Sequence, residues 1–190
     1  MGGSSVDGFG TQPLRTFLKQ RTAASHERLD RSVDALVLAE PGDYARFLHL
    51  QLAARAPIER WAARHCPPDL RPPETADLLR EDLRGLGTGV TGPESRFEPP
   101  PAADPLGLAW AIAGSHMGNR AMLVGLTRAG AQLPCAFLAD PRMGVFWSAL
   151  RPRLEAPANP ASAAHALDAA EAVFACFALA LSACQPRKVA

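Results

Sequence analysis

One histidine lies among small side chains, in the segment TAASHERLD. His26 is next to the apolar positions of an amphipathic segment, with Ala23 and Ser25 beside it, so a flat ligand can approach its ring. A neutral imidazole in such a crevice can ligate haem iron when its other ring nitrogen has an acceptor, and Asp30, four residues on, can supply one. By residue type and spacing alone, a solvated or packed histidine is the commoner outcome.

A second group of small and polar residues interrupts a long apolar segment, in the sequence GSHMGNR. Gly114 and Gly118 are one helical turn apart, with Ser115 and Asn119 between and beside them. Each glycine weakens a helix by about 1 kcal/mol relative to alanine. One interpretation is that the missing side chains let the backbone lie flat against a ligand and allow a kink. The other is close contact between two helices through small residues.

The cysteines, the other histidines and the tryptophans do not have the spacing of metal-binding or nucleic-acid-binding motifs. The four cysteines contain no CxxC pair, which favours buried free thiols over zinc ligands. His49 and His65 have no histidine or acid at metal-ligand spacing, and no Glu-x-x-His sequence is present for a di-iron site. The tryptophans do not alternate with basic residues, so no nucleic-acid surface is expected.

The elements that must position these groups are helices. Apolar residues repeat at three and four positions, and prolines separate the repeats. Gly87 is a natural left-handed helix end, and the following loop to Pro105 is expected to be exposed. The predicted helices cover about residues 14–36, 44–66, 74–86, 106–129, 140–154 and 160–183.

Composition narrows the class of protein. The 190 residues are 47% hydrophobic, enough for a full core, and the net charge of +1 indicates no attraction to nucleic acid or an anionic membrane. The most apolar stretch, residues 173–183, is shorter than the roughly 20 residues needed to cross a bilayer. We therefore expect a soluble cytoplasmic protein.

Together, these segments resemble the haem oxygenase family, in particular the compact bacterial type often found with bacterial phytochromes. The similarity extends over about residues 14–183, in segments that follow the family's order. It implies an all-α, single-domain helical bundle of the haem oxygenase type over residues 13–185. Residues 1–12 are rich in Gly and Ser and lack apolar periodicity, so we expect a disordered tail there, and a short tail at 186–190. The segments are LKQRTAASHERLD, DYARFLHLQLAARAPIE, LLREDLRGLG, AWAIAGSHMGNR and GVFWSAL.

The resemblance also implies an activity. Haem is both bound group and substrate, and is opened with O2 to biliverdin, CO and free iron. Electrons come from an external donor, a ferredoxin or a reductase, because the chain has no flavin or iron–sulfur signature. A bacterial phytochrome is a possible acceptor of the product.

The family places its haem contacts on two helices. By resemblance, His26 is the proximal iron ligand, preceded at four positions by Thr22. Lys19 corresponds to a basic residue directed at a haem propionate, and Asp30 is the second partner of His26.

On the distal segment, Gly114 and Gly118 correspond to the positions of close approach to haem, and Ser115 to the polar position that anchors a distal water. His116, Met117 and Asn119 complete the segment expected against haem.

The sequence also departs from the family pattern. Asn119 stands where the second glycine of the distal pair is usual, Trp110 replaces a tyrosine and Ala113 an acid. His116 either faces away from haem or ligates the iron from the distal side. The final helix lacks a basic residue that pairs with a propionate. These departures keep open an alternative function, a non-catalytic haem carrier or sensor of the same fold.

Overall fold

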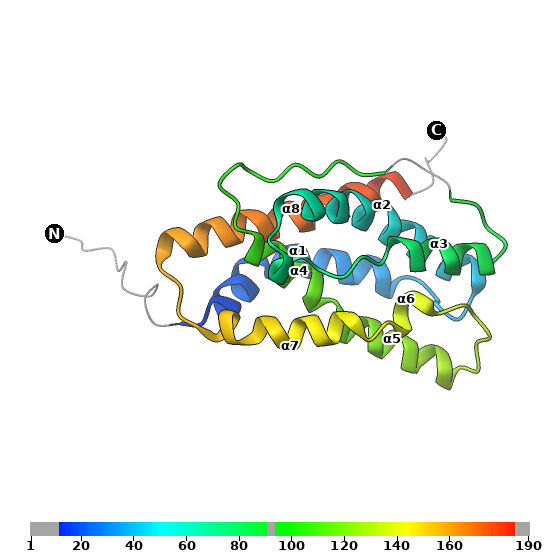
Figure 1. Ribbon diagram of the computed structural model, residues 1–190. Coiled ribbons are helices and arrows are strands. Elements are labelled where there is room, and N and C mark those ends of the chain that lie inside the picture. Colours follow the sequence, from blue (N-terminus) through cyan, green and yellow to red (C-terminus); the bar gives the residue numbers. More distant parts are fainter. Residues whose placement is uncertain (1–11, 91–93, 185–190) are drawn as a thin grey trace.

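The chain folds into a bundle of helices (Figure 1). The computed structural model describes residues 12–90 and 94–184, and within these ranges no β-strand occurs apart from an isolated bridge between Pro13 and Pro157. The all-α class predicted from the sequence is therefore confirmed. The elements are α1 (Leu14–Asp34), α2 (Pro41–His65), the 3-10 turn η1 (Pro68–Leu70), α3 (Ala76–Gly85), α4 (Pro105–Gly114), α5 (His116–Arg128), α6 (Ala136–Ala139), α7 (Arg142–Glu155) and α8 (Pro160–Cys184).

Several predicted boundaries shift. The segment expected as one helix over 106–129 is two helices, α4 and α5, which meet at Ser115. Gly87 has the expected positive φ of 71° just after α3. The loop before Pro105 is not wholly exposed, because Phe97 is buried in the core and Ser95 N–H donates to the Ala53 carbonyl. The predicted tails lie outside the described residues, except at Gln12.

Helix α8 packs against α1, α2 and α4 (Figure 1). Its contact with α4 is close at Gly107, where a Cβ would overlap the carbonyl group of Ala166. Alanines and one valine of α8 are buried in this contact region, so small side chains let the helices approach. They include Ala163, Ala166, Ala169, Ala170, Val173 and Ala180.

The apolar part of α8 is longer than residues 173–183, the stretch expected from the sequence. Residues Pro160–Ala183 have a mean hydropathy of 1.7 and are long and apolar enough to cross a membrane by length and composition. Only 39% of that apolar window is buried inside the bundle, and one helix of this length and composition is weak evidence for a membrane span.

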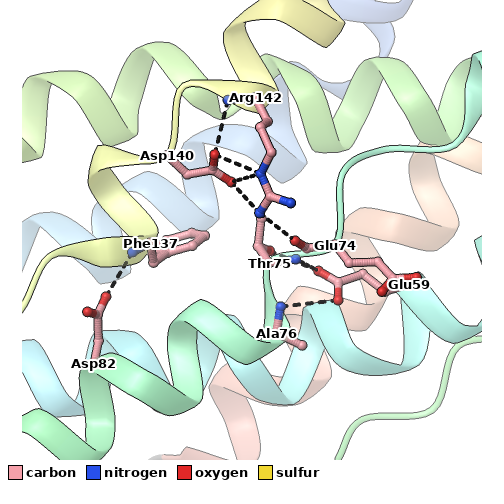
Figure 2. Close-up of polar contacts among 8 residues, drawn as sticks. All are labelled: Glu59, Glu74, Thr75, Ala76, Asp82, Phe137, Asp140 and Arg142. Carbon is pink, nitrogen blue, oxygen red and sulfur yellow. Dashed lines mark hydrogen bonds and ion pairs between the residues drawn. The ribbon is translucent and has the colours of Figure 1, made fainter.

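Carboxylates from neighbouring helices hold the starts of α3 and α6 (Figure 2). Glu59 of α2 accepts hydrogen bonds from the Thr75 N–H and hydroxyl and from the Ala76 N–H. Asp82 of α3 accepts from the N–H groups of Ala136 and Phe137, at 2.8 and 2.9 Å. These side chains satisfy N–H groups that a helix start leaves unpaired, and so they fix α6 and the connection to α7.

Candidate functional site

His26 lies on the exposed face of α1, with 59% of its side chain accessible. Its Nδ1 atom is 2.7 Å from Oδ2 of Asp30, one turn further along the helix. On its other side, the ring meets Phe174 of α8 edge-on, with centroids 6.0 Å apart. Because Nδ1 faces the carboxylate, Nε2 is the ring nitrogen left for a ligand.

Two other predicted residues of α1 have different surroundings. Thr22 is buried, and its hydroxyl donates to the Leu18 carbonyl at 2.9 Å. This bond satisfies the hydroxyl within the helix, so Thr22 contributes to packing beneath His26. Lys19 is exposed on the same helix and is free to reach an anionic group.

The junction between α4 and α5 is held by Ser115. Its hydroxyl donates to the Ile112 carbonyl and accepts from Nη2 of Arg55, both at 2.8 Å. A Cβ on Gly114 would come no closer than 4.0 Å to the ring of Trp147. The break predicted from the two glycines therefore lies at the serine between them, where a side chain pairs with groups on two helices.

Helix α5 presents different residues on its two sides. A Cβ added at Gly118 or Gly125 would meet nothing within 4 Å, so this side is open. A rotation of about 100° per residue places His116 and Leu123 on the opposite side, where they line a cavity. Met117 is 66% exposed. A flat ligand can thus approach α5 closely at Gly118.

His116 is directed toward α7. Its Nδ1 is 2.8 Å from the Ala113 carbonyl oxygen, and its ring centroid is 5.7 Å from that of Trp147. The ring also lies against Gly144. This placement favours the interpretation in which His116 faces away from a ligand at Gly118. Asn119 lines the same cavity as His116.

The cavity beside α5 has a volume of about 550 Å³ and extends to α6 and α7. Arg55 of α2 lies in its wall and is only 2% exposed. Burial lowers the pKa of the Arg55 guanidinium to about 10, against the opposing effect of Glu59. Sequence reasoning missed this residue. The spacing could have indicated that Arg55 is buried, because Arg55 is three residues from both Leu52 and Ile58 on the buried face of α2.

The side chains at the two predicted haem-binding positions suit haem chemically. His26 offers an accessible nitrogen, its other nitrogen faces Asp30, and Phe174 supplies an apolar edge. Gly118 provides a helix surface without a side chain. Within residues 12–90 and 94–184, no group of three His, Cys, Asp or Glu side chains could hold a metal ion by itself, so an iron here would depend on a single protein ligand and the porphyrin.

Comparisons with known proteins show which fold the chain shares. No protein-family model and no curated protein sequence matches the chain. Among solved structures, the NO- and CO-bound heme oxygenase from Neisseria meningitidis matches with a TM-score of 0.69 and 20% sequence identity, over 94% of this chain and 95% of that one. The similarity covers nearly the whole of both chains. The chain therefore has the haem oxygenase fold.

Proposed function

We propose that this protein binds haem through His26 and degrades it as a haem oxygenase, to biliverdin, CO and free iron. The observation that carries the proposal is the His26–Asp30 pair, exposed on α1 in a chain with the haem oxygenase fold. An exposed imidazole with an oriented tautomer is what an axial ligand requires.

Several residues have roles in binding. Asp30 holds the Nδ1 proton of His26, orients the ring and makes Nε2 a better ligand. Phe174 packs against the edge of the imidazole and excludes water from that side. Lys19, exposed about two helical turns before His26, pairs with a propionate. Gly118 allows close approach of α5 to the porphyrin, since any larger side chain would occupy that space.

Ser115 supplies a polar group near Gly118. A hydroxyl has one donor and two acceptor positions, and Ser115 uses its donor on Ile112 and one acceptor position on Arg55. The remaining acceptor position can hold one ordered water. When bound, haem supplies the iron and the oxidisable ring, and the protein orients water and protons beside it.

The donor, the product acceptor and the cellular location remain predictions: a ferredoxin or reductase, a bacterial phytochrome and the cytoplasm. The carrier or sensor alternative is motivated by the missing basic residue on α8. The two functions differ in whether bound haem is consumed.

The test is an aerobic absorbance time course of the haem-reconstituted protein with a ferredoxin system, with catalase present to remove free peroxide. Decay of the Soret band with growth of a biliverdin band and release of CO is expected. His26→Ala should lose the imidazole-ligated spectrum and keep its helical circular dichroism, whereas His165→Ala, exposed on α8, should behave as the wild type. Stable haem through many reduction cycles would favour the carrier, and an unchanged Soret band in His26→Ala would refute the ligand assignment.

A further inference from the structure

The cavity between α5 and α7 contains a buried positive charge without a paired carboxylate. In the described residues, no carboxylate oxygen lies within ion-pair distance of Arg55. Glu59 lies one turn along α2, but its oxygens accept three hydrogen bonds from the start of α3 (Figure 2). Glu59 therefore acts on Arg55 only through space, without a direct hydrogen bond. A ligand carboxylate would give the guanidinium a direct partner.

The guanidinium of Arg55 keeps unused donors. Of the five N–H groups of an arginine, Nε–H donates to Gln51 and one Nη2–H to Ser115. The ring of Phe137 lies 5.0 Å from the Arg55 Cζ atom and offsets part of the charge. The Nη1 group makes no hydrogen bond to any described residue, and Arg55 lines the cavity.

A second cation lines the same cavity. Arg120 of α5 is in its wall, with the amide of Asn119 beside it. The carboxylate in the wall, Asp140, is already bound by the side chain and backbone N–H of Arg142 (Figure 2). The charge of Asp140 is thereby neutralised, and the wall retains a positive balance from Arg55 and Arg120.

The rest of the wall is largely apolar. Leu123, Phe137, Met143 and Val145 face the cavity together with these cations. A ligand that suits both parts has one carboxylate and an apolar body, since a guanidinium binds a carboxylate through two parallel hydrogen bonds. We propose that this cavity is a second binding site, separate from the predicted haem site, for a small organic monocarboxylate held by Arg55 and Arg120.

The site is separate because of the geometry of α5. The cavity residues His116 and Leu123 are on the side of the helix opposite Gly118, where haem is expected. Binding of the carboxylate therefore does not depend on the haem proposal, and the two can fail independently.

The experiment is calorimetric titration of the purified protein with benzoate, and with benzamide as the uncharged analogue. We expect saturable binding of benzoate to the wild type, and binding of benzamide at least about ten-fold weaker. Arg120→Met should lose benzoate affinity by a similar factor, because the variant lacks one charge-assisted hydrogen-bonding partner. Arg128→Met, on the same helix but outside the cavity, should bind as the wild type. Arg55→Met should also lose affinity; if it fails to fold, Arg120→Met still decides.

Three results would overturn the proposal. These are no heat of benzoate binding in the wild type, equal affinity for benzamide, or unchanged affinity in Arg120→Met. Titration of the haem-loaded protein and of His26→Ala separates the two sites. Benzoate should bind both with the wild-type affinity, and displacement of benzoate by haem would contradict a separate site.

Discussion

Asp30 places a carboxylate oxygen 2.7 Å from Nδ1 of His26, one turn along the exposed face of α1. The pair lies at the surface, so its Coulombic contribution to folding is small. Its contribution to ligand binding is larger, because the carboxylate selects the tautomer that leaves Nε2 free.

Asp30→Asn should therefore lower haem affinity by about ten-fold, as is usual for loss of the partner of a ligating histidine. The protein should keep its wild-type unfolding free energy. Haem titration at the Soret band measures the first quantity and urea unfolding the second. Glu27→Gln, which removes a neighbouring exposed carboxylate of α1, is the matched control. Equal haem affinity in Asp30→Asn and the wild type would rule out this role.

Two substitutions at Gly118 should have different effects on folding stability and on haem turnover. Its Cβ position is open, so Gly118→Ala should stabilise the haem-free protein by about 0.5–1 kcal/mol through helix propensity. Gly125→Ala, also at an open position of α5, should give a similar gain. Gly118→Leu should remain folded and lose haem turnover, because the side chain fills the space expected above the porphyrin. Full turnover in Gly118→Leu would place haem elsewhere.

The sequence predicted the helices because their apolar periods are long. It also carried the His26–Asp30 spacing and the interruption at GSHMGNR, since both depend on neighbours along one helix. It did not predict the short α6, whose start depends on two hydrogen bonds to Asp82, more than fifty residues earlier in the chain.

The cavity could not be predicted for a similar reason. Arginine is expected at the surface, and only the packing of α6 and α8 around α2 buries Arg55 between Phe137 and Phe177. The direction of His116 likewise follows from the break at Ser115 and the position of Trp147 on α7. Long-range packing, which periodicity does not encode, decides both.

Gly107 is required by the contact between α4 and α8. Gly107→Ala should destabilise the protein by about 3 kcal/mol, since the added methyl group would overlap the Ala166 backbone and force the helices apart. Gly42→Ala, at an open position near the start of α2, controls for the change in propensity. Urea unfolding of both variants measures the difference. An unchanged midpoint for Gly107→Ala would mean that the two helices are not in this contact.

Titration of Asp82 should make the unfolding free energy of the protein depend on pH. Burial raises the pKa of this carboxyl above its usual 3.8, despite the hydrogen bonds from Phe137 and Ala136. The folded state then keeps the Asp82 proton to higher pH than the unfolded state, so the contribution of Asp82 to stability falls as pH rises from 3.8 through the folded pKa. Asp82→Asn removes this titration. The difference in unfolding free energy, wild type minus Asp82→Asn, should decrease across that range, and a constant or rising difference would contradict the assignment.

Two buried cysteines should resist alkylation. Burial raises the pKa of the Cys66 thiol to about 11 and that of Cys176 to about 12, so little thiolate forms near neutral pH and both sulfurs are covered. In a Cys184→Ser background, iodoacetamide at about pH 8 should leave both cysteines unmodified in the folded protein and modify them in denaturant, as measured by peptide mass spectrometry. Cys135, which is partly exposed, should react before either of them. Cys176 Sγ donates to the Ala54 carbonyl of α2. Rapid modification of Cys176 in the folded protein would mean that α8 separates from α2, and the packing of these two helices would have to be abandoned.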